Sequence, residues 1–346
     1  MIPVQNIYYM LAYAFRALES NGYKNMKTEQ FDNVAELCAA ILHRGVSLQL
    51  KQGLGKEYIP FTETTSSLKG KIDYTTSLKD NTIIKSQMVC TYDDFSLNTY
   101  MNRIIKTTIL YLLRSDISAK RKKDLRKIII YFNEIDVLDR YTINWGFHYN
   151  RNNQTYRLLM FICRLILKDL IQGTAGGTSR MMDFMDDQEL HTLYEKFILE
   201  FYRTERKDIS ASSSYVTWQT DDGFTDMLPA MHTDIMLRKG KKTFIIDAKY
   251  YSHSMQKSQH GKQTFHSGNL YQIFTYVKNE RENVMASGGV VSGMLLYAKT
   301  DENQTPDNNT YMMSGNQITV HSLDLNRDFD DIKTELNKIA DAAFDE

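Results

Sequence analysis

Two aspartates face one another across a predicted hairpin in the second half of the sequence. Two apolar segments flank the Lys-Gly-Lys-Lys sequence at 239–242, which is typical of a turn between two strands. We take Arg238 to pair with Thr243 across this turn. The antiparallel register then places Asp234 opposite Asp247, with Cβ atoms ~5 Å apart.

A lysine joins this pair. Strand periodicity puts Lys249 on the same face as Asp247. Two carboxylates this close repel one another unless a cation lies between them, and Mg²⁺ prefers oxygen ligands of this kind. A water positioned by Lys249 could attack a phosphodiester while the metal stabilises the developing charge. The sequence therefore predicts Mg²⁺-dependent phosphodiester hydrolysis, with Asp234 and Asp247 as metal ligands and Lys249 as the third catalytic residue.

The Asp-x-Lys spacing alone is weak. Glu205-x-Lys207 and Asp331-x-Lys333 have a similar spacing, but both lie in predicted helices. Only the sequence at 247–249 ends an apolar strand and has an aspartate across a hairpin. The alternative interpretation is a surface hairpin in which Lys249 merely pairs with Asp247.

Three supporting residues lie on predicted helices. Glu195 sits at the edge of the apolar arc of a helix over 188–206, from which its carboxylate could reach the site. It could equally be a solvated glutamate. Gln272 and Tyr276 share one face of a helix over 269–279. Core packing would explain Tyr276, but Gln272 lies among apolar neighbours and needs a polar target.

The surrounding pattern indicates an α+β first half and an α/β second half. Amphipathic spacing predicts helices at 5–18, 32–51, 97–114 and 154–171, and alternation predicts strands between 56 and 95 with turns at Lys69-Gly70 and Asp80-Asn81. Later come a helix at 188–206, strands at 214–219, 231–238 and 243–250, a helix at 269–279, strands at 289–298 and 317–323, and a helix at 331–343. This order indicates a mixed sheet flanked by helices. The glycine-rich segment 173–177 is the linker candidate.

Charge divides the chain at the same place. Net charge is zero, but residues 1–180 hold 25 Lys+Arg against 16 Asp+Glu, and residues 181–346 hold 17 against 26. Basic residues are densest at 120–123. A basic half suits phosphates or an acidic partner, and an acidic half can hold a cation; the alternative for 120–123 is a solvated helix face.

Several classes of protein are disfavoured. Three scattered cysteines argue for a reducing compartment, and neither a signal peptide nor a membrane span is evident, so a cytoplasmic location away from membranes is expected. The sequence has no P-loop motif, and we find no helix-turn-helix or zinc-finger spacing. An enzyme that hydrolyses phosphodiesters without its own motor or base reader must be directed to its target by another protein.

These residues resemble a known superfamily. Asp234 and Asp247-Ala248-Lys249, with Glu195 before them and Gln272-xxx-Tyr276 after, are similar to the PD-(D/E)xK nucleases. Thr233 stands where that pattern has a proline, a departure that the superfamily tolerates. The resemblance implies a restriction-endonuclease-like fold for residues 181–346.

A longer resemblance covers nearly the whole chain. Its segments are IPVQNIYYMLAYAF, LKGKIDYTTSL, NRIIKTTILYLL, LYEKFILEF, TDIMLRKGKKTFIIDAKYY and FHSGNLYQIFTYV. They resemble the McrC family, the nuclease subunits of McrBC modification-dependent restriction systems. This implies a DNA endonuclease that works with, and stimulates, an McrB-like AAA+ GTPase hexamer. It also implies that the partner binds GTP, that the substrate is double-stranded DNA carrying modified cytosine, and that nuclease domains pair when two complexes meet. Residues 1–180 are then expected to dock the partner and possibly contact DNA, and residues 181–346 to form the nuclease domain.

Two other functions remain open at this point. A non-catalytic regulator would bind a AAA+ ring and stimulate nucleotide hydrolysis, but it has no need for opposed carboxylates. A stand-alone RecB-like repair nuclease also uses Gln-xxx-Tyr, but it fits poorly with the resemblance of residues 1–114.

Overall fold

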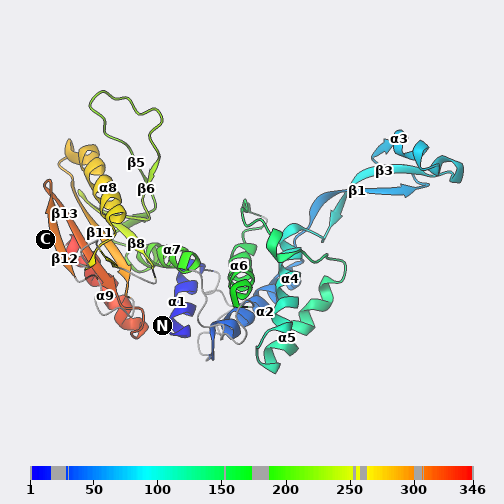
Figure 1. The fold of residues 1–346 in the computed structure, drawn as a ribbon, viewed down its shortest axis with the longest axis horizontal. Helices are drawn as coiled ribbons and strands as arrows, with labels where there is room; N and C mark the ends of the chain where they lie inside the picture. Colours follow the sequence, from blue (N-terminus) through cyan, green and yellow to red (C-terminus); the bar gives the residue numbers. More distant parts are fainter. Residues whose placement is uncertain are drawn as a thin grey trace. The chain divides into compact units, whose positions relative to one another are not determined.

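The protein is built from two compact units. The computed structural model describes residues 2–16, 29, 31–151, 153–173, 187–251, 255–257, 263–299, 306 and 308–344. The first unit, called the sheet unit below, comprises Met1–Val34 and Met182–Glu346. The second, called the helical unit, comprises Ala35–Met181. Each is described by itself (Figure 1).

A six-stranded mixed sheet forms the centre of the sheet unit, in the order β12-β13-β11-β8-β7-β4. β8, β11 and β13 pair in parallel, and the other neighbours are antiparallel. The strands are β4 (Ser210–Ser212), β7 (Ile235–Lys239), β8 (Lys242–Lys249), β11 (Val290–Ala298), β12 (Asn309–Met313) and β13 (Asn316–Leu323). Two short pairs lie outside this sheet: β5 (Tyr215–Val216) with β6 (Met231–His232), and β9 (Gln256–Lys257) with β10 (Gln263–Thr264).

Helices cover both faces of this sheet, as the buried residues of β8 require. α8 (Ser267–Met285) packs through Ile273 and Val277 on the face that bears Ile245. Gly293 allows this approach, because a Cβ there would lie 2.5 Å from Val277. Phe244 points to the opposite face. There it meets the last helix, α9 (Phe329–Phe344), which accepts a hydrogen bond from α7 (Asp187–Glu205).

The first helix belongs to the sheet unit and not to the unit that follows it. In α1 (Val4–Ala14), the Asn6 amide donates to the carbonyls of Leu325 and Arg327, each at 2.8 Å. The Tyr13 hydroxyl donates to Glu205 on α7 at 2.5 Å. Residues 1–34 therefore separate from residues 35–180, with which the sequence analysis had grouped them. The contacts responsible are non-local, so local patterns could not reveal them.

The helical unit contains α2 (Val34–Gln52), α4 (Tyr100–Arg114), α5 (Ala119–Ile129) and α6 (Tyr156–Gly173). Side chains cap two of these helices, because the hydroxyls of Thr99 and Ser118 accept from the free amides of the first turns of α4 and α5. α5 was not predicted, since its charged residues obscure its apolar spacing. Short 3-10 turns, η4 (Ile130–Phe132) and η5 (Arg140–Thr142), follow it.

A long arm extends from the helical unit (Figure 1). β1 (Glu57–Thr65) and β3 (Met88–Ser96) pair antiparallel along their whole lengths, and β2 (Lys71–Asp73), α3 (Tyr74–Lys79) and η3 (Thr82–Lys85) complete it. The arm exposes many large apolar side chains: Tyr58, Phe61, Leu68, Tyr74, Leu78, Ile83, Ile84 and Phe95. Both predicted turns are confirmed, with Gly70 and Asn81 in the left-handed region. The predicted strands are confirmed only at β1, β2 and β3, because residues 74–79 and 82–85, which were also predicted as strand, form α3 and η3.

The expected mixed sheet flanked by helices is confirmed. The predicted strand 231–238 is instead two strands, β6 and β7, with Thr233 and Asp234 between them. The linker candidate begins at Gly173, the last residue of α6, and otherwise lies outside the described residues. Among the residues described, no helix is both long and apolar enough to span a membrane.

Candidate active site

The hairpin of β7 and β8 places the two aspartates opposite one another. Arg238 pairs with Thr243, which is the register that the sequence predicted. Ile235 is the first residue of β7 and pairs with Ile246. Asp234 directly precedes this pair and Asp247 directly follows it, so the two carboxylates lie at the same end of the hairpin.

Asp247 is completely buried, and its carboxylate is unsatisfied. Neither of its oxygens has a hydrogen-bond partner of normal geometry. The Lys249 ammonium lies 2.9 Å from Asp247 Oδ2, as an ion pair rather than as an aligned hydrogen bond. Asp234 Oδ2 accepts a hydrogen bond from the backbone amide of Ala248 at 3.1 Å. Asp234, Asp247 and Lys249 therefore converge, as the sequence analysis expected.

Burial and mutual repulsion make this pair of carboxylates basic. Burial, followed by the charges of Asp247 and Glu195, raises the pKa of Asp234 to about 8. Burial also raises the pKa of Asp247, although Lys249 opposes that shift. For Lys249, burial disfavours the ammonium, but the charges of Asp247 and Asp234 outweigh burial and raise its pKa. Without a further cation, the carboxylate pair retains a proton near neutral pH.

The donor set fits a hard divalent cation. The buried oxygens of Asp247 accept no aligned hydrogen bond, and Lys249 pairs with only one of them, so a cation would satisfy the acceptor capacity that remains. Over the described part of the chain, no group of three or more His, Cys, Asp or Glu residues is placed to hold a metal. Mg²⁺ commonly uses only one or two protein carboxylates and keeps several waters, so Asp234 and Asp247 suffice as a protein contribution.

Glu195 lies near this pair but has its own partner. It projects from α7, and its Oε1 lies 2.8 Å from Nδ1 of His191, one helical turn earlier. Its charge acts on both aspartates and raises the pKa of each. Sequence reasoning overlooked His191, although the i,i+4 spacing to Glu195 was available.

Gln272 and Tyr276 support the chain segment that carries Asp234. The Gln272 amide donates to the Tyr276 hydroxyl at 3.0 Å, and that hydroxyl donates to the carbonyl of His232 at 3.1 Å. His232 ends β6, two residues before Asp234. Tyr276 is therefore the polar partner that we expected for Gln272.

A second set of hydrogen bonds fixes the residue before Asp234. Thr233 is fully buried, and both its amide and its hydroxyl donate to the carbonyl of Ser214, at 2.9 and 3.0 Å. Ser213 donates its hydroxyl to the Thr233 carbonyl at 2.7 Å. These bonds interrupt the predicted strand at 231–238. No sequence signal marked the serines, because their partner lies about twenty residues away.

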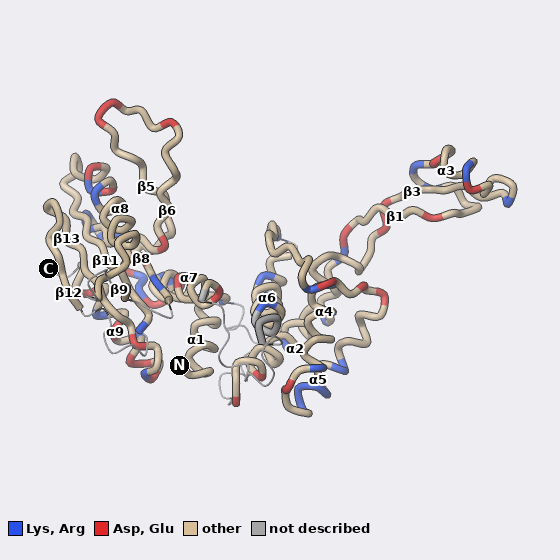
Figure 2. Tube along the Cα trace, in the orientation of Figure 1, with Lys and Arg blue, Asp and Glu red and all other residues tan. Residues whose placement is uncertain are grey.

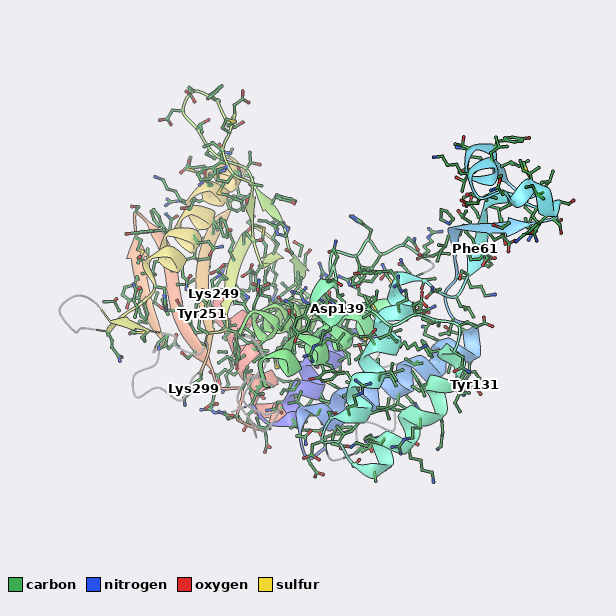
Figure 3. All side chains as sticks on the ribbon, turned by 45° about the vertical axis from the view of Figure 1, so that its right-hand side comes forward. Phe61, Tyr131, Asp139, Lys249, Tyr251 and Lys299 are labelled. Atoms are coloured by element: carbon green, nitrogen blue, oxygen red, sulfur yellow. The ribbon has the colours of Figure 1, made fainter. Side chains whose placement is uncertain are left out.

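Beyond Lys249, an aromatic side chain was also missed. Tyr251 follows Lys249 by two residues (Figure 3), and its hydroxyl donates to Asn269 Oδ1 at 3.3 Å. Asn269 in turn donates to the hydroxyl of Tyr297, which pairs with Lys249 in the sheet register. The His266 ring lies 5.3 Å from that of Tyr251. The strand alternation that linked Asp247 to Lys249 would have found Tyr251 too.

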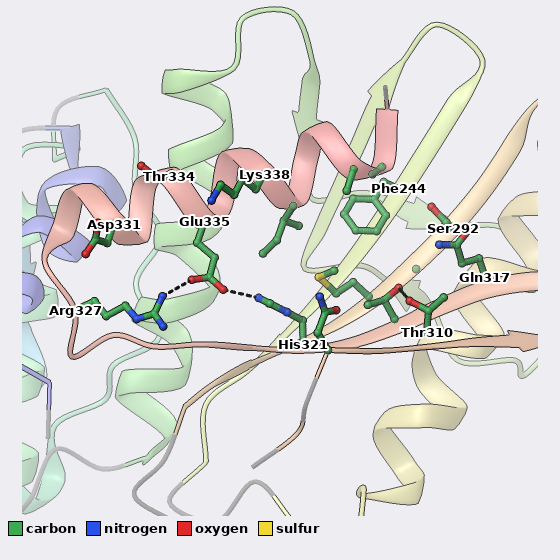
Figure 4. Close-up of a pocket in the computed structure, with 17 residues that line it drawn as sticks. Phe244, Ser292, Thr310, Gln317, His321, Arg327, Asp331, Thr334, Glu335 and Lys338 are labelled. Atoms are coloured by element: carbon green, nitrogen blue, oxygen red, sulfur yellow. Dashed lines mark hydrogen bonds and ion pairs between the residues drawn. The ribbon is translucent and has the colours of Figure 1, made fainter. Parts of the chain in front are cut away.

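A hollow lies on the opposite face of the sheet. It has a volume of about 840 Å³ and lies between α9 and the strands β11, β12 and β13 (Figure 4). Glu335 pairs there with His321 at 2.9 Å and Arg327 at 3.2 Å. Phe244 lines this hollow, whereas Asp247 occupies the other face of β8. The hollow is therefore separate from the candidate active site.

Comparison with known families decides the assignment. Residues 4–298 match the family of McrBC 5-methylcytosine restriction system components. The chain belongs to this family. The match extends over both units and includes Asp234, Asp247 and Lys249, so the expected McrC resemblance is confirmed at the level of the family.

Similar proteins agree with this membership in the McrBC family. The chain is 29% identical over 347 residues to the type IV methyl-directed restriction enzyme EcoKMcrBC of Escherichia coli K12, covering 99% of this chain and 98% of that protein. It also resembles a chain in an assembly of Thermococcus gammatolerans McrB AAA+ hexamers with bound McrC. That match has a TM-score of 0.50 at 16% identity, over 97% of this chain and 76% of the other. At this identity the structural match shows similarity of fold.

Proposed function

We propose that this chain is the nuclease subunit of a methylation-dependent, type IV restriction complex. It is a PD-(D/E)xK endonuclease that hydrolyses DNA phosphodiester bonds with Mg²⁺. Asp234 and Asp247 hold the metal, and Lys249 completes the catalytic set. Glu195, Gln272 and Tyr276 support it.

One observation carries the catalytic part of this proposal. A fully buried carboxylate that accepts no aligned hydrogen bond lies opposite a second carboxylate of raised pKa. The ion pair with Lys249 compensates only one of its oxygens, so the arrangement is costly to keep in a fold without a ligand. A divalent cation relieves both costs. A surface hairpin with scattered charges, the alternative considered from sequence, would leave these groups in water.

The residues divide the chemical work. Mg²⁺, when bound, supplies Lewis-acid stabilisation of the charge that develops on the phosphate, together with an activated water. Lys249 keeps its charge because of its two acidic neighbours, so its ammonium donates to the attacking water or to a phosphate oxygen. The hydrogen bonds from Ala248 and Tyr276 keep Asp234 and the preceding residues in place.

The partner is an McrB-like AAA+ GTPase hexamer. The Thermococcus relative is described as McrC bound to McrB AAA+ hexamers, and this chain has no P-loop, so GTP is bound by the partner. The arm of the helical unit is the docking element, because its exposed apolar side chains exceed what an isolated surface requires. Nuclease domains pair when two such complexes meet.

A cleavage assay tests this function. Duplex DNA with and without 5-methylcytosine is incubated with the chain, Mg²⁺ and GTP, in the presence and absence of the AAA+ protein encoded beside it. We expect cleavage only of methylated DNA and only with the partner. Full GTPase stimulation by a complex that never cuts DNA would favour the regulator; cutting without the partner would favour the stand-alone nuclease.

A further inference from the structure

Basic charge is concentrated in the helical unit. Residues 35–181 hold 22 Lys and Arg against 13 Asp and Glu, whereas the rest of the chain holds 20 against 29. Within the helical unit, residues 120–127 alone contribute six cations and one acid. One helix, α5, therefore supplies more than half of the positive excess. Its Lys and Arg positions are blue in Figure 2.

The two sides of α5 differ in character. Leu125 and Ile128 are buried, and Arg121 is buried with them in an ion pair to Glu36 at 3.4 Å. Lys123 and Arg126 are exposed on the other side. With the half-buried Lys122 and the exposed Lys127, they form what we call the α5 surface. Lys127 is partly offset by Asp124, the sole acid of this helix, at 3.0 Å.

The positive field extends to the neighbouring helix α2. Burial lowers the pKa of His43, and the charges of Arg121, Lys127 and Arg44 lower it further against the opposing effect of Asp124. Burial is the largest of these causes, and Asp124 is the strongest of the charges. Two cations of α5, Arg121 and Lys127, therefore act on a side chain of α2, although Asp124 offsets part of their effect.

We propose that the α5 surface binds the phosphate backbone of duplex DNA and retains the substrate for the catalytic residues of the sheet unit. This inference rests on the proposed function, because it takes DNA as the substrate. The sheet unit carries a net negative charge and repels phosphates. Substrate retention must therefore come from elsewhere, and within this chain the largest excess of cations is on α5. Lysine and arginine contacts to phosphates are indifferent to base sequence, so this binding does not depend on methylation.

The residues beside the α5 surface help to decide whether its ligand is DNA or a protein. Ile130 and Tyr131, directly after α5, are 63% and 64% exposed. An acidic protein would anchor on these apolar side chains, because interface energy is concentrated in such residues. DNA would depend on the cations and on the release of counterions from the phosphates. The cations are more numerous, and they lie at helical spacing over about 10 Å of the helix.

The test measures DNA binding without cleavage. The full-length chain is titrated into a fluorescent, unmethylated duplex of about 40 base pairs in EDTA, at several KCl concentrations. For Lys123→Glu/Arg126→Glu we expect affinity at least about 10-fold weaker and a log–log salt slope shallower by about 2, since each phosphate contact contributes about 0.9. Lys123→Gln/Arg126→Gln should lie between this variant and wild type. The matched control, Lys51→Glu/Arg151→Glu, reverses two exposed cations of the same unit and should change affinity by less than about threefold.

Tyr131→Ala tests the alternative that this surface binds a protein. We expect DNA affinity close to wild type for this variant. If Lys123→Glu/Arg126→Glu keeps the wild-type affinity and salt slope, the proposal is wrong. If that variant and Tyr131→Ala both lose binding to the AAA+ partner while keeping DNA binding, the surface docks a protein. Because cleavage is blocked throughout, a failure of the nuclease assignment would appear in the cleavage assay and not here.

Discussion

The side-chain amide of Asn6 donates to the main-chain carbonyl of Leu325, a residue 319 positions later in the chain, at 2.8 Å. A second donation, to the carbonyl of Arg327, uses the other amide hydrogen. Because Asn6 and Leu325 are both buried, the Leu325 carbonyl has no access to water as a substitute. The beginning and the end of the chain thus form one folding unit.

Asn6→Ala should destabilise the sheet unit selectively. Leaving the buried carbonyl of Leu325 without its donor costs about 1–3 kcal/mol. We expect faster hydrogen exchange in α7 and α9, with little change in α4 and α6. Asn133→Ala, at an exposed position of the helical unit, is the control. Loss of protection in α4 and α6 instead would contradict the assignment of α1 to the sheet unit.

Replacing either aspartate should abolish cleavage and preserve the fold. Asp247→Asn or Asp234→Ala removes a proposed metal ligand and also relieves repulsion between buried carboxylates, so the melting temperature without metal should stay equal or rise. Calorimetry with Mg²⁺ and the cleavage assay measure both effects. Asp331→Asn has the same Asp-x-Lys spacing in a helix and should cut normally. Cleavage at the wild-type rate by Asp247→Asn would refute the site.

Lys249→Ala should separate catalysis from metal binding. Lysine is no ligand for Mg²⁺, so metal affinity should persist while the cleavage rate falls by roughly 10²–10³, the usual effect of a positioned donor. Lys333→Ala is the matched control, because it lies at the same spacing from Asp331. Loss of Mg²⁺ binding together with the rate would show that Lys249 is structural.

Tyr276→Phe should lower metal affinity and cleavage without removing a proposed metal ligand. It removes the hydrogen bond to the carbonyl of His232, two residues before Asp234, and keeps the packing of the ring. Loss of such outer contacts typically lowers metal affinity or activity by about 10–100-fold. Gln272→Ala acts through Tyr276 and should show a smaller effect in the same direction. Unchanged Mg²⁺ affinity and cleavage in Tyr276→Phe would confine this residue to core packing.

Stability without metal should fall as pH rises. The pKa of Asp234 is about 8 in the folded chain, against 3.8 for an ordinary aspartate, so folding favours the protonated form. That stabilisation is fully present below about pH 4 and is lost as pH increases through about 8. In EDTA, the melting temperature should decrease between these values, where each 1 kcal/mol corresponds to about 2–4 °C. Asp234→Asn should flatten the dependence, and Asp331→Asn should not. A wild-type melting temperature that stayed constant or rose over this range would contradict the raised pKa.

Local sequence patterns predicted the hairpin of β7 and β8 and the opposed aspartates at its end. The register from Arg238 and Thr243 followed from a turn sequence and two apolar runs, and it fixed the opposition of Asp234 and Asp247. The same reasoning stopped where partners are distant in sequence. The hydroxyl of Thr233 donates to the carbonyl of Ser214, which lies 19 positions earlier in the chain. The break between β6 and β7 could therefore not be inferred from local sequence.

Two further differences have physical causes. The helix α5 lacked an evident apolar stripe because only Leu125 and Ile128 of its few apolar residues are buried. The edge strands β4 and β12 are short or largely exposed, and their pairing depends on neighbours that fold from other parts of the chain. The roles of Asp234, Asp247 and Lys249 remain predictions for the experiments above.

The interruption of the sheet unit by residues 35–181 has a consequence for synthesis on the ribosome. α1 emerges before the helical unit, but the strands and helices that complete its fold are translated only after that unit. The helical unit and its arm are whole before β8 and Asp247 leave the exit tunnel. A nascent chain can therefore present its proposed docking surface to a partner before its candidate active site is complete, so that assembly can precede the proposed activity.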